Sequence, residues 1–240
     1  MIIPSIVQAV SSILAVTLAG NCGRNMIQTY QVSRRDATPV HTERLLGSIA
    51  NVDSPESVLE CLKSMKRSDL IHLFKVSRTP TDLAELEGEW NGCLLNNNGL
   101  IMTTVSSIMT NGLFGKFRKW NGKWLQDSGR GINRFLTTDG IATEHSFDYG
   151  LSESRLVQKQ KVVKLTYTKH HHPFSLWHTM VDEVRFIPGD IEILIGFGSM
   201  AWSGGYLNAA PFCLWRSQND PSNYNNVQQT SETYTNPADL

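Results

Sequence analysis

One segment of the sequence, residues 176–187, carries the polar side chains best suited to acid–base chemistry. Its composition is that of a β-strand, in which alternate side chains point to the same face. The alternation places five side chains on one face: His178, Met180, Asp182, Val184 and Phe186. If this face points into an apolar core, Asp182 and His178 are candidate catalytic residues, because a carboxyl group shielded from water can donate or accept a proton.

Asp182 has two interpretations at this stage. A buried carboxylate must be paired, hydrogen-bonded or protonated. An ion pair with Arg185, or with Arg216 at the end of the last apolar segment, would make Asp182 a structural residue. In the other interpretation Asp182 anchors a ligand or acts as a general acid, and the sequence leaves both open.

A second segment, Trp120-Asn121-Gly122-Lys123-Trp124, combines aromatic side chains with a lysine. Asn-Gly is a frequent turn dipeptide, so the segment is predicted to form a hairpin that leaves its lysine in solvent. One alternative places Lys123 at the mouth of a ligand site, beside Trp120 and Trp124. Another makes this segment, with the basic and aromatic side chains of 114–119 before it, a patch that faces a membrane. The other candidate ligand-binding residues are large apolar or cationic side chains of predicted strands: Trp90, Met180, Phe186, Phe212 and Arg216.

Three consecutive histidines, 170–172, predict a solvent-exposed turn and not a metal site. Consecutive strand residues point to opposite faces, so at most two of these rings could share an ion, and Pro173 follows at once. No cysteine pair has zinc-ligand spacing, and neither a dinucleotide fingerprint nor a Gly-x-Ser-x-Gly nucleophile motif occurs. We therefore expect no metal and no other cofactor.

The pattern from Leu86 onward predicts a mainly β protein. Short β-rich segments alternate with Gly and Asn turn signals. The predicted strands cover 88–95, 132–137, 143–149, 155–169, 176–187, 191–202 and 210–216. Their spacing favours one antiparallel sheet closed into a barrel, and residues 100–113 fit either a helix or a lid near the barrel mouth.

The chain before the barrel divides into two predicted parts. Residues 1–20 are apolar and uncharged, which fits a membrane anchor, a signal peptide or a hydrophobic helix docked on the barrel. Three arginines follow, so an anchor would leave the bulk of the chain facing the cytoplasm, whereas a signal peptide would make the protein secreted or lumenal. Residues 21–82 are predicted to form a linker, with room for one short helix around 42–49, and a helical pair that starts at Ser54-Pro55-Glu56.

The composition limits the partners. The 240 residues include 22 basic and 22 acidic side chains with no basic stripe, which argues against a nucleic-acid partner. Residues 217–240 contain no Lys or Arg and few apolar side chains, so they are predicted to be a disordered tail. The four cysteines are predicted to be unpaired thiols; a Cys93–Cys213 disulfide is the alternative if the first and last strands are neighbours.

Several short motifs resemble one family. Gly88-Glu89-Trp90-Asn91-Gly92 looks like the motif of the GXWXG domain, and Trp120-Asn121-Gly122-Lys123-Trp124 resembles a later element of that domain. Residues 182–185, 194–198 and 211–216 are similar to the domain of unknown function that often follows it. The resemblance covers residues 83–216 and implies a lipocalin-like, calycin-type barrel, in which Trp90 plugs one end and the glycines let other backbone pass closely. It implies no established activity.

These observations support three functional hypotheses. In the first, the barrel binds a small hydrophobic molecule, such as a lipid, terpenoid, polyketide or pigment, near a membrane that residues 2–20 contact. In the second, it is a cofactor-independent isomerase or cyclase that uses Asp182, assisted by His178, as general acid or base. In the third, it is a non-catalytic accessory subunit of a membrane complex. A filled barrel interior favours the third hypothesis, and an open cavity favours the first two.

Overall fold

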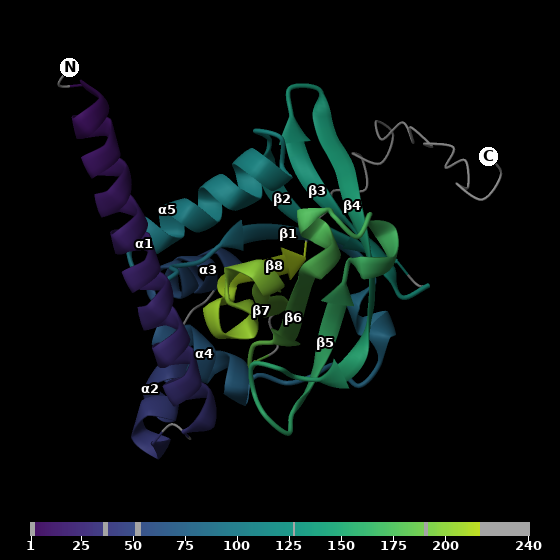
Figure 1. Ribbon diagram of the computed structural model, residues 1–240. Coiled ribbons are helices and arrows are strands. Elements are labelled where there is room, and N and C mark those ends of the chain that lie inside the picture. Colours follow the sequence, from purple (N-terminus) through teal and green to yellow (C-terminus); the bar gives the residue numbers. More distant parts are fainter. Residues whose placement is uncertain (1–2, 36–37, 51–53, 127, 190–191, 217–240) are drawn as a thin grey trace.

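The computed structural model describes residues 3–35, 38–50, 54–126, 128–189 and 192–216. Within them, eight antiparallel strands form a closed barrel in which each strand pairs with the next and β8 pairs with β1 (Figure 1). The strands are β1 (Gly88–Leu94), β2 (Lys119–Leu125), β3 (Arg130–Thr137), β4 (Gly140–Glu153), β5 (Lys161–Thr166), β6 (Met180–Phe186), β7 (Ile193–Met200) and β8 (Ala210–Arg216). The predicted mainly β, lipocalin-like barrel is confirmed.

The up-and-down order sends successive connections to opposite ends of the barrel. One end, here called the α5 end, receives the β1–β2, β3–β4, β5–β6 and β7–β8 connections. Their short helices are α5 (Leu100–Ser107), the π-helix η2 (Ile108–Phe114), η3 (Thr168–His170), η4 (Leu176–Thr179), η5 (Ala201–Ser203) and η6 (Gly205–Asn208). The other end, the η1 end, lies beside η1 (Leu83–Leu86), which leads into β1. The helical reading of residues 100–113 is thus correct.

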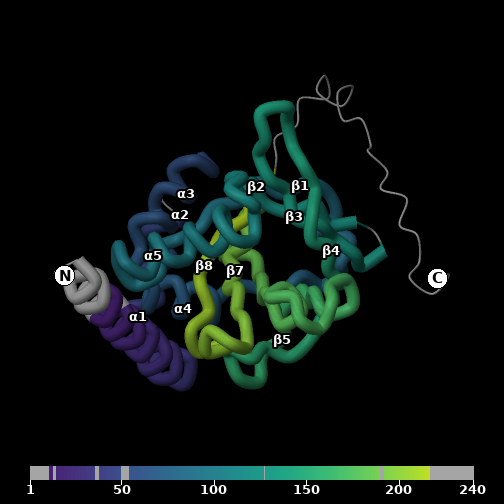
Figure 2. Tube along the Cα trace, turned by 45° about the horizontal axis from the view of Figure 1, so that its top comes forward, coloured from purple at the N-terminus to yellow at the C-terminus, as the bar shows by residue number. Residues whose placement is uncertain are grey.

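Among the residues that the structure describes, four α-helices precede the barrel and cover part of its outer wall. They are α1 (Ile3–Arg34), α2 (Pro39–Ala50), α3 (Pro55–Ser64) and α4 (Arg67–Val76). Ser54 caps α3 as expected, since its Oγ accepts a hydrogen bond from the Ser57 amide at 3.2 Å. Figure 2 shows α1 along one side of the molecule, where it contacts α4, α5 and η6. Helix therefore extends through much of the segment that was predicted to be a linker.

The helices and the barrel share a core outside the barrel. Its buried side chains include Leu62 of α3, Phe74 of α4 and Phe197 of β7. Cys93 and Cys213 also face this side; they are partners in the β1–β8 register, and their Sγ atoms lie 3.4 Å apart. All four cysteines are free, in agreement with the sequence-based prediction.

Glycines allow β1 and β2 to approach closely, as the first strand motif predicts. A Cβ on Gly92 would lie 2.7 Å from the Trp120 ring, and one on Gly122 would lie 2.0 Å from the Trp90 carbonyl oxygen. Gly122 also has a φ of +117°, which other residues rarely adopt. These contacts explain why glycine stands at both positions.

The predicted hairpin at Trp120–Trp124 is wrong. These residues lie within a single strand, β2, whose pairing with β3 shifts register between Trp120 and Gly122. Asn121-Gly122 forms this irregularity instead of a turn, because the positive φ of Gly122 serves a bulge as well as it serves a hairpin. As a consequence, Trp120 and Lys123 both point into the barrel although they are three residues apart.

The predicted disordered tail, 217–240, lies outside the described residues. Among the residues that the structure describes, no helix combines the length and the apolar character needed to cross a bilayer.

Candidate functional site

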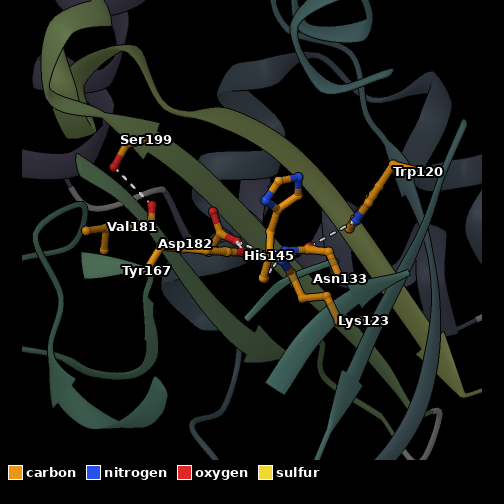
Figure 3. A network of polar contacts seen from close by, with 8 residues as sticks. All are labelled: Trp120, Lys123, Asn133, His145, Tyr167, Val181, Asp182 and Ser199. Atoms are coloured by element: carbon orange, nitrogen blue, oxygen red, sulfur yellow. Dashed lines mark hydrogen bonds and ion pairs between the residues drawn. The ribbon is translucent and has the colours of Figure 1, made fainter. Parts of the chain in front are cut away.

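Four polar side chains meet inside the barrel. Lys123 of β2, Asn133 of β3, Tyr167 beyond β5 and Asp182 of β6 converge in Figure 3. The Lys123 Nζ atom lies 2.9 Å from Asp182 Oδ2, 2.8 Å from Asn133 Oδ1 and 2.8 Å from the Tyr167 hydroxyl. The exposed fraction of the Lys123 and Asp182 side chains is 2% and 1%, so this is a fully buried ion pair.

Hydrogen bonds fix the protonation states in this cluster. Tyr167 donates its hydroxyl proton to Asp182 Oδ2 at 3.0 Å and accepts from Asn133 Nδ2 at 3.1 Å. Burial, together with the Asp182 charge, raises the pKa of Tyr167 well above its ordinary value, so it remains a neutral donor. Burial lowers the pKa of Lys123, and the neighbouring Asp182 carboxylate opposes that shift. The carboxylate partner therefore favours the charged form of the lysine, whereas burial disfavours it.

The second oxygen of Asp182 has no hydrogen-bond partner among the described residues. Oδ1 is buried, and buried polar atoms are rarely left in this state. Gly198 is the register partner of Asp182 on β7, and a Cβ on Gly198 would lie 2.8 Å from Oδ1. Glycine at position 198 therefore leaves this carboxylate oxygen uncovered on the side of β7.

Aromatic rings enclose the lysine. The Nζ atom lies 4.9 to 5.7 Å from the ring centroids of four side chains: Trp120, Phe147, Tyr167 and Phe212. Such contacts stabilise a cation that water does not reach. A polar centre thus lies within a wall that is otherwise apolar.

A stack of rings covers the cluster on the side of the α5 end. His145 stacks on Trp177 with a centroid distance of 3.9 Å, and its Nε2 atom lies 3.0 Å from the Phe114 carbonyl oxygen. His171 stacks on the same tryptophan at 5.8 Å. Burial is the main cause that lowers the pKa of His145 to about 4, so its ring is neutral at physiological pH.

A backbone irregularity directs His145 into the barrel. In the β3–β4 pair, Ile132 is opposite Ser146 and Asn133 is opposite Glu144, so His145 is the extra residue of a bulge. Its φ is +62°, an uncommon value for a residue with a side chain. Bulges of this kind often redirect a side chain next to a functional site. Its carbonyl oxygen accepts a hydrogen bond from Asn133 Nδ2 at 3.0 Å, which links the bulge to the polar cluster.

At the same end, methionine side chains pack against the interior cluster. Met109 of η2, Met180 of β6 and Met200 of β7 are partly buried against the interior cluster, and Met180 and Met200 are register partners. Met180 precedes Asp182 by two residues, so its side chain lies next to Asp182 on the inward face. Methionine is flexible and accommodates varied apolar surfaces.

Trp90 closes the η1 end. It is completely buried, its indole donates to the Leu86 carbonyl oxygen at 2.7 Å, and the Arg216 guanidinium lies 4.3 Å from its ring centroid. Phe186 packs beside it with a centroid distance of 6.0 Å. This is the plug that the strand motif predicts.

The ion pairs predicted for Asp182 are wrong. Arg185 points to the outer face of β6 and donates to the Phe74 carbonyl oxygen at 2.9 Å. Arg216 lies at the η1 end and pairs there with Glu192 at 3.3 Å. The partner is Lys123, which the hairpin prediction had placed in solvent.

His178 and Trp124 do not join the site. His178 belongs to η4, since β6 begins only at Met180, and its Nδ1 atom lies 3.1 Å from the His171 carbonyl oxygen. The predicted shared face with Asp182 is therefore wrong. Trp124 follows Lys123 on β2 and takes the outward face. The structure brings the other candidates to the barrel interior or its plugged end: Trp90, Trp120, Lys123, Met180, Asp182, Phe186, Phe212 and Arg216.

Sequence reasoning missed Asn133, Tyr167 and His145. Asn133 shares the inward face of β3 with Phe135, and a polar residue on an apolar face was an available signal. Tyr167 follows Val163 and Leu165 at intervals of two, which is a similar signal. No sequence signal marks the bulge at His145. The described residues hold no group of three or more His, Cys, Asp or Glu side chains arranged for a metal ion.

Comparisons with protein-family models, with curated proteins and with solved structures find no match to this chain. The resemblance to the GXWXG domain therefore stays a prediction.

Proposed function

We propose that the barrel binds a small hydrophobic molecule that carries one hydrogen-bond donor. The observation that supports this most directly is the buried Asp182 Oδ1 atom without a partner. A ligand O–H or N–H group placed there would satisfy this acceptor, and hydrogen bonds to charged groups are the stronger ones. The aromatic wall around Lys123 would contact the rest of the ligand.

The charge balance of the cluster favours a neutral ligand. Lys123 already compensates Asp182, so a cationic ligand would leave an excess positive charge in a water-poor interior. An alcohol, a phenol or an amide N–H matches the free acceptor without adding charge. Terpenoid, polyketide and lipid alcohols are the classes that combine such a group with an apolar body.

Ligand entry is proposed at the α5 end. Interior side chains such as Phe135, Phe147 and Tyr167 are shielded from solvent, so a ligand reaches them only when side chains at one end of the barrel move. The methionines and the Phe114–Trp177 contact at the α5 end are the adaptable part of the wall. The η1 end is closed by Trp90 and by the Arg216 guanidinium.

Blocking the uncovered oxygen tests this proposal. Gly198→Ala places a methyl group against Asp182 Oδ1, whereas Gly150→Ala on β4 adds a methyl group that meets nothing within 4 Å. Tryptophan quenching by the neutral probe N-phenyl-1-naphthylamine measures binding in both variants. We expect wild type and G150A to bind alike and G198A to bind at least tenfold more weakly. Wild-type protein that neither binds the probe nor retains an apolar molecule in native mass spectrometry would contradict the proposal.

The same oxygen supports a second candidate function. Asp182 Oδ1 could take or give a proton in an isomerase or cyclase reaction, with the Tyr167 hydroxyl bound to the other oxygen of the carboxylate. Incubation of the molecule retained by wild-type protein with wild type and Asp182→Asn separates the two functions. Loss of product at a ligand concentration that saturates both proteins supports catalysis, and no conversion by wild type leaves binding alone.

A further inference from the structure

We propose that the α5 end of the barrel docks on the surface of a lipid bilayer, with its apolar loop tips inserted among the lipids. This inference rests on the proposed function in one respect: membrane docking would allow the barrel to exchange its ligand with the bilayer. Its evidence is separate, because it comes from the outer surface and not from the interior.

Exposed large apolar side chains gather at this end. They lie on the β1–β2, β5–β6 and β7–β8 connections and include Leu100, Leu113, Phe117, Phe174, Leu176 and Trp202. Phe117 and Phe174 are each 93% exposed. Among the described residues, the connections at the η1 end carry no exposed large apolar side chain. A concentration of this kind marks an interaction surface.

The two ends also differ in charge. At the α5 end, residues 95–115, 173–181 and 199–215 contain no Asp, Glu, Lys or Arg. At the η1 end, each of the three connections, 126–129, 154–160 and 187–192, contains at least one charged residue. The charged residues of the α5-end connections, Lys116, Arg118, Asp139 and Lys169, lie outside these segments. Long uncharged segments are unusual on a surface that faces only water, and they suit insertion into a bilayer.

Phe117 lies in a tight turn whose backbone points its ring outward; its amide donates to the Gly112 carbonyl oxygen at 3.1 Å. Its φ is +65° and that of Lys116 is +50°, both in the left-handed region that disfavours residues with side chains. The ring is almost fully exposed, so packing does not offset this strain. The turn therefore needs the strained backbone but not an exposed phenyl ring, and it presents that ring to the outside beside a lysine.

The shape and charge of the surface favour a bilayer over a folded protein partner. The apolar residues belong to separate connections, and lysines lie among them, as in peripheral membrane proteins. Lys116 and Lys169 are exposed although each pairs with a carboxylate, Glu144 and Asp148 respectively, and Lys119 is exposed as well. Glu144 also pairs with Arg118, so basic side chains outnumber acidic ones in this group. Figure 1 also shows the N-terminal part of α1, which is uncharged up to Arg24, projecting to the same side as the β3–β4 hairpin. With the apolar side chains of the α5 end inserted, the basic side chains beside them would contact anionic headgroups.

Vesicle binding by the full chain tests the inference. Sedimentation with vesicles of phosphatidylcholine, with and without 30% phosphatidylserine, would measure the partition coefficient of wild type and of Phe117→Asn/Phe174→Asn. We expect wild type to bind both kinds of vesicle, and to bind those with phosphatidylserine more strongly. The partition coefficient of the double variant should be lower by roughly tenfold or more, because the transfer of each phenyl ring from water into lipid is favourable. Val40→Asn/Leu151→Asn removes exposed apolar side chains elsewhere and serves as the matched control, with an expected change below about twofold.

The stability of Phe117→Asn provides an independent readout. Asparagine tolerates the left-handed region better than phenylalanine, so this variant should melt at a higher temperature while it binds vesicles less well. Three results would overturn the inference. Wild type would bind neither kind of vesicle, the double variant would bind vesicles as strongly as wild type, or the control variant would lose as much vesicle binding as the double variant. Probe binding in the absence of vesicles tests the barrel interior alone, so failure of one proposal is distinguishable from failure of the other.

Discussion

Two fully buried cations, Lys123 in the barrel and Arg67 on α4, are stabilised in different ways. Arg67 donates to the Ala209 carbonyl oxygen at 2.8 Å, to Asn97 Oδ1 at 3.1 Å and to the Asn25 carbonyl oxygen at 3.4 Å. These acceptors are neutral, and they belong to α1, the β1–α5 connection and the η6–β8 connection. Lys123 instead has a carboxylate partner and a phenol that bonds to the same oxygen.

The difference separates a structural cluster from a site that can accept a ligand. Arg67 joins segments that are distant in sequence, and its donors point to them. Asn25 Oδ1 in that cluster also lacks a partner, but it is a neutral amide oxygen whose Nδ2 already makes two hydrogen bonds. The Lys123 cluster leaves a carboxylate oxygen unused in an aromatic interior, which is more costly and so more informative about function.

Removing Lys123 should have the largest effect on stability. Lys123→Met leaves Asp182 buried without its counter-ion, so we expect the free energy of unfolding to fall by about 3–5 kcal/mol in urea titrations. Lys123→Met/Asp182→Leu removes both charges and should recover most of that loss. A double variant no more stable than the single one would show that the pair is not what stabilises this region.

Removing Arg67 should have a smaller effect that does not reach the barrel interior. Arg67→Met leaves neutral acceptors unpaired. We therefore expect the free energy of unfolding to fall by roughly 2–3 kcal/mol and α1 to be cleaved faster by proteases. Binding of N-phenyl-1-naphthylamine should stay within about twofold of wild type, because additivity holds for distant sites. Loss of probe binding in this variant would mean that the two clusters are coupled.

Part of the barrel and part of the Lys123 cluster could be predicted from the sequence. Alternation along β6 correctly placed Asp182, Val184 and Phe186 inward, and the glycine–tryptophan motif correctly gave the plugged barrel. The partner of Asp182 could not be predicted, because Lys123 reaches the interior only through the bulge at Gly122. Turn and bulge use the same Asn-Gly signal, and only the pairing of β2 with β3 distinguishes them.

The ring stack above Lys123 should respond to acid. The pKa of His145 is lowered from 6.5 to about 4 in the folded state, so its neutral ring contributes full stability above pH 6.5. That contribution is lost progressively as the pH falls from 6.5 to about 4, by on the order of 1 kcal/mol because solvent reaches part of the ring. His145→Phe should reduce this pH dependence in thermal melts. If the melting temperature of the variant depends on pH as steeply as that of wild type, His145 is not the source of the pH dependence.

The central claim is that Asp182 Oδ1 accepts a hydrogen bond from a ligand, and a matched pair of ligands tests it most directly. Menthol has a hydroxyl donor where menthone has only a carbonyl acceptor, and competition of each against N-phenyl-1-naphthylamine gives the ratio of their affinities. The account predicts that wild type prefers menthol by roughly tenfold, as expected for a hydrogen bond to a carboxylate, and that Asp182→Asn loses this preference. Equal affinity of wild type for the two molecules, or an unchanged preference in Asp182→Asn, would contradict it.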